Sequence, residues 1–148
     1  MPAVYLDADA CPVKDEAIKV IIRHTLKLFI VSNGGIRPST NPLIRNVLVS
    51  DDPDAADIWI LDHVRENDIV VTSDIPLAKG CLEREAKVLK PNGDVFDLNN
   101  IDNLLATRNL MADLRSGDPM FQNKIKPFSR KDRSKFLNSL ELELQRVL

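Results

Sequence analysis

The stretch Asp-Ile-Val-Val-Thr-Ser-Asp-Ile-Pro-Leu-Ala-Lys-Gly-Cys-Leu (residues 68–82) predicts one short strand followed directly by one helix. Its apolar run, residues 69–71, is typical of a strand that is buried on both faces of a parallel sheet. Pro76 suits the first turn of a helix, because the N–H that proline lacks has no helical partner there. A short strand that leads into a helix in this way is half of a βαβ unit.

The same alternation of short apolar runs and helical patterns extends over most of the chain. The expected strands cover residues 4–6, 27–31, 46–49, 68–72, 87–89 and 94–96. The expected helices cover residues 13–24, 54–64, 76–82, 101–114 and 129–148. This order predicts a three-layer α/β/α fold with a central, mainly parallel sheet and a helical C-terminal extension from about residue 101. Because 148 residues suit one hydrophobic core, we expect a single domain over residues 1–148.

Composition and charge narrow the classes of function. A net charge of −2 argues against a general nucleic-acid coat, although it leaves room for a local basic patch. Aromatic residues make up only 5%, which disfavours a base-stacking platform. We read neither a signal peptide nor an apolar run of the roughly 20 residues that span a bilayer. The two cysteines lack zinc-site spacing, so we expect a cytoplasmic protein with reduced thiols and no membrane association.

Acidic side chains follow two of the expected strands at the points where these strands end. Asp7 and Asp9 come directly after the first strand, and Asp74 follows the strand at 68–72. In open α/β sheets, ligands bind beyond the carboxyl ends of the strands. Asp54 and Asp57 lie three residues apart at the start of a helix and therefore share one face of its first turn. Their placement near the same edge is a weaker expectation.

Carboxylates that converge must take up protons, stay apart or hold a cation, since each pair at ~4 Å repels by about 4 kcal/mol at a surface-like dielectric. An all-oxygen set of this charge favours Mg²⁺ or Mn²⁺ over zinc. The natural chemistry is metal-assisted phosphodiester hydrolysis. Any one such Asp is more often a turn former or an N-cap, so only the combination of positions indicates a site.

Several motifs now suggest a family. These are Asp-Ala-Asp-Ala-Cys-Pro-Val-Lys (residues 7–14), Ala-Ala-Asp-Ile-Trp-Ile (55–60), Val-Thr-Ser-Asp-Ile-Pro-Leu-Ala (71–78), Met-Ala-Asp-Leu-Arg-Ser-Gly (111–117) and Phe-Ser-Arg-Lys-Asp-Arg (128–133). With them the chain resembles, over nearly its whole length, the uncharacterised bacterial family UPF0178 (YaiI/YqxD, DUF188). Relatives usually carry Gly-Gly-Pro before the Phe-Ser segment, whereas this chain has Asn-Lys-Ile-Lys-Pro at residues 123–127.

The family is similar to PIN-like domains, and that similarity implies particular roles. Nuclease members of that superfamily use an Asp at the end of the first strand, acidic residues on helices and an Asp in a Thr-x-Asp motif. Asp7, Asp57 and Asp74 match these positions, so the resemblance implies that they hold the metal. Asp9 belongs to the motif of UPF0178 itself and would be a further ligand or a base, with Asp54 as a weaker fifth candidate. Nuclease activity rests here on fold analogy.

Basic side chains provide the candidate nucleic-acid contacts. The basic cluster consists of Lys124, Lys126, Arg130, Lys131, Arg133 and Lys135. It could follow a phosphate backbone beside the acidic site, or it could be the solvated start of a helix, where Ser129 and Asp132 have capping-box spacing. Lys14 and Arg45 are further candidate phosphate contacts or simple surface charges.

The remaining candidates have simpler interpretations. His24 and His63 lack partners at metal-ligand spacing, and Cys11 beside anions is expected to be an inert thiol. Trp59 and Ile60 lie in the apolar stretch of a helix, where core packing is expected.

The leading hypothesis is therefore a Mg²⁺- or Mn²⁺-dependent nuclease that acts on RNA, with Asp7, Asp9, Asp57 and Asp74 as its catalytic residues. A haloacid-dehalogenase-like phosphatase is the second hypothesis, because Asp-x-Asp after a first strand is the nucleophile and acid/base pair of that superfamily. A third is a silent module that binds RNA or a protein partner. The sequence leaves a homodimer open.

Overall fold

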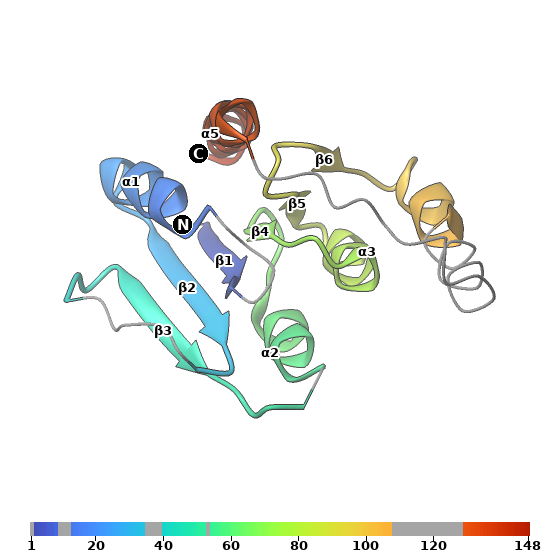
Figure 1. The fold of residues 1–148 in the computed structure, drawn as a ribbon, viewed down its shortest axis with the longest axis horizontal. Helices are drawn as coiled ribbons and strands as arrows, with labels where there is room; N and C mark the ends of the chain where they lie inside the picture. Colours follow the sequence, from blue (N-terminus) through green and yellow to red (C-terminus); the bar gives the residue numbers. More distant parts are fainter. Residues whose placement is uncertain (1, 9–12, 35–39, 53, 108–128) are drawn as a thin grey trace.

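The sheet of this protein confirms the predicted α/β architecture. The computed structural model describes residues 2–8, 13–34, 40–52, 54–107 and 129–148. Six strands within these residues form one sheet in the order β3-β2-β1-β4-β5-β6 (Figure 1). They are β1 (Ala3–Asp7), β2 (Lys27–Ser32), β3 (Ile44–Leu48), β4 (Ile69–Val71), β5 (Lys87–Leu89) and β6 (Val95–Phe96). Every pairing is parallel except that of β6 with β5.

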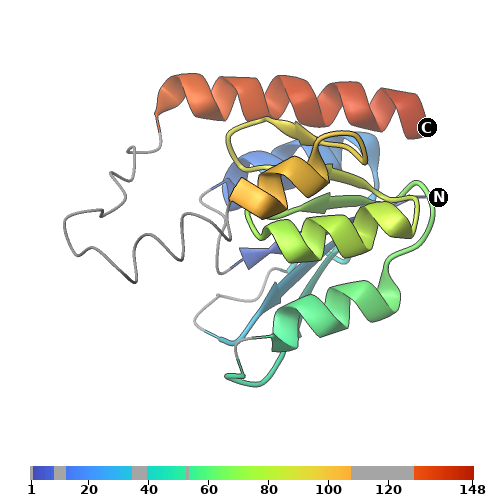
Figure 2. The ribbon, with the colours of Figure 1, turned by 90° about the vertical axis from the view of Figure 1, so that its right-hand side faces the viewer.

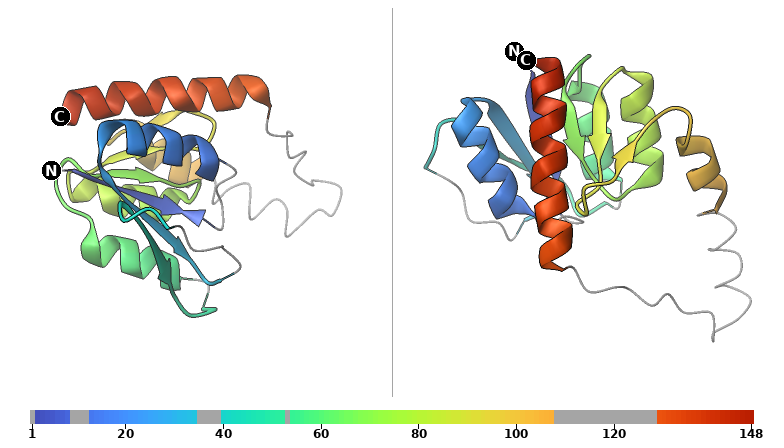
Figure 3. Two further views of the ribbon diagram at one scale, coloured as in Figure 1. Left: turned by 90° about the vertical axis from the view of Figure 1, so that its left-hand side faces the viewer. Right: turned by 90° about the horizontal axis from the view of Figure 1, so that it is seen from above.

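Helices cover both faces of the sheet. They are α1 (Lys14–His24), α2 (Ala55–His63), α3 (Ile75–Glu83) and α5 (Arg130–Val147), and residues 101–107 are helical as well. α1 and α5 pack on one face and α2 and α3 on the other, which gives the predicted three layers (Figures 1 and 3). The helix expected at 101–114 is confirmed as far as residue 107, and residues 108–114 lie outside the described part.

The short strand β4 shows why the apolar runs become strands here. Ile69 and Val71 join the core under α1 and α5, whereas Val70 joins the core under α2 and α3. All three are fully buried, because side chains alternate between faces and both faces are covered by helices. Burying each of these side chains stabilises the fold by about 2 kcal/mol.

The helix α5 closes the layer that α1 begins. Phe136, Leu140 and Leu144, spaced four residues apart, lie on one stripe of α5 and are fully buried. Ser129 and Asp132 form the predicted capping box at its start, where the Ser129 hydroxyl accepts from the Asp132 N–H at 3.1 Å. The C-terminal extension is therefore part of the core rather than an appendage.

The connections reverse direction between β1 and β4. From β1 the chain passes through α1 to β2, while from β4 it passes through α3, on the other face, to β5. Adjacent parallel strands whose connections leave in opposite directions open a crevice at their carboxyl ends, where α/β proteins bind ligands. α2, α3 and α5 all begin at this edge (Figure 2).

Candidate acidic site

The first member of the site, Asp7, is the last residue of β1. It lies on the same side of the strand as Tyr5, whose side chain packs in the core under α2 and α3. Its side chain is buried, and its Oδ2 accepts a 2.9 Å hydrogen bond from the Thr72 hydroxyl. Thr72 Oγ1 in turn accepts from the Asp74 N–H at 3.0 Å. These two hydrogen bonds connect the end of β1 to the segment that follows β4 and thereby fix the position of the Asp7 carboxylate.

Asp74 has a structural role as well as its place in the site. It is the N-cap of α3, where its Oδ1 accepts from the Leu77 N–H at 2.9 Å. The capping alternative is thus correct for this residue, and it uses one carboxylate oxygen. Among the described residues no hydrogen bond to Asp74 Oδ2 is found.

Asp57 provides the clearest electrostatic sign of convergence. It lies in the first turn of α2, half-buried, two residues before Trp59. Its pKa is raised from 3.8 to about 7, mainly by burial and then, in decreasing order, by the charges of Asp74, Asp7 and Asp54. A helix N-terminus stabilises an anion and would lower this pKa, but burial and the neighbouring charges raise it by more. Three separate segments therefore bring their carboxylates close enough to repel one another.

Asp54 behaves differently from an ordinary cap. It occupies the N-cap position of α2, yet its side chain makes no capping hydrogen bond. It is exposed, and its charge contributes least of the three neighbours to the raised pKa of Asp57. The prediction that Asp54 and Asp57 lie near the same edge as Asp7 and Asp74 is supported by this coupling.

The convergence stops short of a preformed metal centre. Within the part of the chain that the structure describes, no group of three or more His, Cys, Asp or Glu residues is placed to hold a metal ion. Asp9, expected to be the fourth member, lies outside the described residues, as do Cys11, Lys124 and Lys126. The acidic residues are thus neighbours rather than a closed set of ligands, and the metal site stays a prediction.

The described basic candidates do not form one cluster, and most of them lie on α1 and α5. Lys14 is the first residue of α1, and Arg130 and Lys131 lie exposed in the first turn of α5. These helices begin at the acidic edge but on the face opposite to α2 and α3 (Figure 3). Arg133 Nη1 is only 2.7 Å from Glu16 Oε1 and therefore stabilises the contact between α5 and α1.

Two further basic candidates lie elsewhere. Arg45 lies on the outer strand β3, where it pairs in register with Phe29 of β2. The strand β2 therefore separates Arg45 from β1 and from Asp7. Lys135 makes an ion pair with Asp94 in the segment before β6. The structure does not bring either residue to the acidic edge.

The histidines and Trp59 were expected to be ordinary helix and core residues, and the structure agrees in part. His24 Nε2 lies 2.8 Å from Glu141 Oε2, and the ring of His63 stacks on Trp59 with centroids 3.8 Å apart. Ile60 is fully buried as predicted, but Trp59 is only partly buried, at the margin of the core. Thr72 was not identified as a site residue from its own properties, although the Thr-x-Asp motif contains it.

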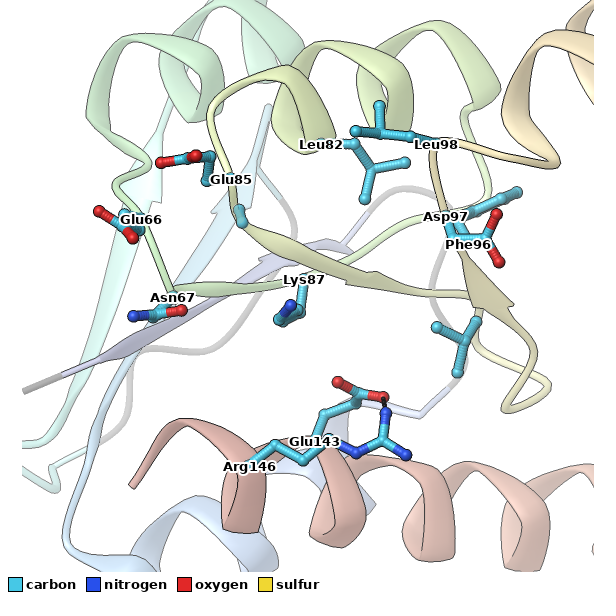
Figure 4. Close-up of a pocket in the computed structure, with 12 residues that line it drawn as sticks. Glu66, Asn67, Leu82, Glu85, Lys87, Phe96, Asp97, Leu98, Glu143 and Arg146 are labelled. Carbon is cyan, nitrogen blue, oxygen red and sulfur yellow. Dashed lines mark hydrogen bonds and ion pairs between the residues drawn. The ribbon is translucent and has the colours of Figure 1, made fainter.

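A cleft of about 530 Å³ lies near the opposite edge of the sheet. Figure 4 shows Lys87 at the start of β5 pointing into the space above α5, where Glu143 pairs with Arg146 at 3.1 Å. Its charges are mixed and Glu143 already has its counter-ion, so the cleft offers no convergent set of groups. None of Asp7, Asp57 and Asp74 lines this cleft, so it is distinct from the acidic site.

Comparisons with known proteins place this chain in a family. Residues 5–146 match the family model described as uncharacterised BCR, YaiI/YqxD family (DUF188). The chain belongs to this family. The UPF0178 protein of Roseobacter denitrificans is 56% identical over 99% of this chain and 97% of its own length. That of Agrobacterium fabrum is 48% identical over 99% of this chain and 95% of its own length.

The match to the family model covers nearly all of the helices and strands described above. The names of these UPF0178 relatives state no activity. No solved structure gives a significant match to this chain. Among the described residues, no helix has both the length and the apolar character that a bilayer crossing requires.

Proposed function

We propose that this UPF0178 protein is a PIN-like phosphodiesterase that uses Mg²⁺ or Mn²⁺ and acts on RNA. The observation that carries the proposal is that Asp7, at the end of β1, and Asp74, just after the adjacent strand β4, are linked through the Thr72 hydroxyl at 2.9 and 3.0 Å. The pKa of Asp57, raised to about 7 by burial and by the charges of Asp74 and Asp7, supports it. Mutually repelling carboxylates at the switch point of a parallel sheet are stabilised by a bound cation. This placement supports a metal-dependent hydrolase better than a purely structural role for the three residues.

Asp7, Asp57 and Asp74 would hold the metal ion. The ion would supply an activated water and neutralise charge on the leaving oxygen. Mg²⁺ usually keeps several of its waters, so a site for it does not need protein ligands on every side. Asp9, three residues before Pro12 in the same loop motif, remains a further candidate ligand.

The chain's own residues prepare this site in three ways. Thr72 holds one oxygen of Asp7, so the orientation of that carboxylate is set before any ligand arrives. Asp74 accepts from the Leu77 N–H through Oδ1, which holds its carboxylate at the start of α3. Asp57 binds a proton over part of the physiological range, so metal binding would release that proton and strengthen as the pH rises.

The two other hypotheses have less support. A phosphatase would use Asp7 as its nucleophile, but Asp7 is only 6% exposed and one of its oxygens accepts from Thr72. Such a carboxylate suits a ligand better than an attacking group. The third hypothesis, a binding module without catalytic activity, would use the same acidic site as the nuclease. Only an activity test distinguishes the two.

The test is a calorimetric titration with Mn²⁺ at pH 8 on the wild type and on Asp7→Asn combined with Asp74→Asn. The matched control is Glu66→Gln combined with Glu85→Gln, which removes the same charge from two exposed positions at the opposite edge. We expect the control to bind as the wild type does and the aspartate variant to lose at least tenfold in affinity. Unchanged Mn²⁺ affinity in the aspartate variant would refute the metal site.

A panel of single-stranded RNAs with Mn²⁺ then tests turnover. Cleavage that disappears in Asp57→Asn, with the circular dichroism spectrum unchanged, is the expected result. Metal binding without cleavage, together with salt-dependent RNA binding, would instead favour the silent module.

A further inference from the structure

A groove of about 540 Å³ lies beside the acidic edge, between the end of β3 and the first turns of α2. Its apolar wall is formed by Val49, Ile58 and Trp59. Ile58 is 57% exposed, so part of this apolar wall is open to solvent. The volume falls in the range of small-molecule sites, so the groove can take one flat ring system.

The indole of Trp59 is fixed before any ligand binds. Its ring centroid lies 5.8 Å from that of Phe29 and 6.0 Å from that of Tyr5, and the ring of His63 stacks on it at 3.8 Å. A preorganised aromatic wall loses little conformational entropy on binding. The groove is therefore suited to a planar, partly apolar ligand.

The polar groups of the groove are almost all hydrogen-bond acceptors. The described residues that line it include the carboxylates of Asp52, Asp54 and Asp62 and no basic side chain. Asp52 Oδ2 accepts from the Ser50 hydroxyl at 3.1 Å, which orients that carboxylate. A phosphate group would be repelled here, whereas a ligand with adjacent N–H donors would be matched.

The groove and the acidic site are linked by Asp54. Asp54 lines the groove, and its charge also acts on Asp57 in the first turn of α2. A strand whose phosphate lies at the acidic edge would thus have one neighbouring base within reach of Trp59 and Asp52. The negative lining would repel the sugar–phosphate chain more strongly than an uncharged base.

We propose that this groove is a base subsite that selects a nucleobase carrying an amino group, with guanine preferred; this rests on the proposed function. Guanine presents two adjacent N–H donors on its Watson–Crick edge, which a carboxylate accepts together. Uracil presents one N–H between two carbonyl oxygens, and carboxylates repel those oxygens. Cytosine and adenine, with one amino group each, fall between the two.

The experiment uses the fact that Trp59 is the sole tryptophan of the chain. Tryptophan fluorescence of the metal-free protein, excited at the red edge of its absorption, is titrated with guanosine, cytidine, adenosine and uridine. Nucleosides carry no phosphate, so the groove alone is probed. We expect guanosine to quench with an apparent affinity at least fivefold above that of uridine, and Asp52→Asn to reduce this preference at least fivefold.

A matched variant, Asp97→Asn, removes an exposed carboxylate from the opposite cleft and should leave the preference unchanged. Equal quenching by guanosine and uridine, or none by any nucleoside, would overturn the proposal. Quenching by a lysine- and arginine-rich peptide alone would overturn it in favour of a basic protein partner. Since the titration needs neither metal nor cleavage, failure here is distinguishable from failure of the nuclease proposal.

Discussion

Replacing Asp57 by Asn should make the stability of this protein less dependent on pH. In the folded protein the pKa of Asp57 is raised to about 7 by burial and by Asp74, Asp7 and Asp54. In the unfolded chain those influences vanish and the pKa returns to 3.8. Between these two values the folded form binds more protons than the unfolded form. The wild type therefore loses stability as the pH rises from about 4 through about 7, and Asn, which cannot ionise, removes this loss.

The size of the effect follows from the shift. Each pKa unit corresponds to 1.36 kcal/mol, so a shift of about 3 units gives an upper limit of about 4 kcal/mol. Asp57 is only half-buried, and solvent screening reduces the effect to about 2 kcal/mol. For a chain of this size that corresponds to roughly 4–8 °C in Tm. The advantage of Asp57→Asn should be small at pH 4.5 and nearly complete at pH 8.

The assay is urea unfolding, followed by circular dichroism, at several values between pH 4.5 and 8. Asp62→Asn is the matched control, because Asp62 is an exposed carboxylate one turn further along α2. Its effect should be small and should not grow over this pH range. An Asp57→Asn advantage that stays constant or shrinks as the pH rises would refute the coupling of the three carboxylates.

Three further predictions concern the supports of the fold. Gly93 has φ +93°, and a Cβ there would lie 2.6 Å from the Lys135 carbonyl carbon, so Gly93→Ala should lower the free energy of unfolding by roughly 2 kcal/mol or more. Wild-type stability in a urea titration of that variant would contradict the close approach of this turn to α5. Ser129→Ala removes the capping box and should destabilise by about 1 kcal/mol, measured as a fall in Tm. Burial raises the pKa of the Cys81 thiol to about 12, so its peptide should stay unalkylated by iodoacetamide at pH 8 until urea is added. Rapid labelling of Cys81 in the native protein would show that this helix opens.

Local patterns in the sequence were enough for the elements of the fold. The run at residues 69–71 predicted a strand buried on both faces, and the structure buries all three side chains. The Ser129–Asp132 spacing predicted a capping box, which forms at the start of α5. These features depend on residues within a few positions of one another, so the sequence contains them directly. The end of the helix predicted at 101–114 lies beyond the described residues.

Contacts between distant segments could not be obtained in the same way. The sequence placed Asp7 and Asp74 at strand ends, but the pairing of β1 with β4 depends on the crossover through α2. Thr72 illustrates the difference, because its hydroxyl matters only once Asp7, 65 residues earlier, lies 2.9 Å away. The groove beside Trp59 was also missed, since a helix residue in an apolar stretch reads as core whether or not a layer covers it.

The sequence by itself determined the βα alternation, the caps at Asp74 and Ser129 and the presence of an Asp at or shortly after the end of each central strand. Those properties follow from side-chain periodicity and from local hydrogen bonding. Only the tertiary structure decided that Asp57 approaches Asp7 and Asp74, that Arg45 stays on the outer strand, and that the described carboxylates do not close around an ion. Electrostatic coupling depends on distance and burial, and both are set by how the layers pack.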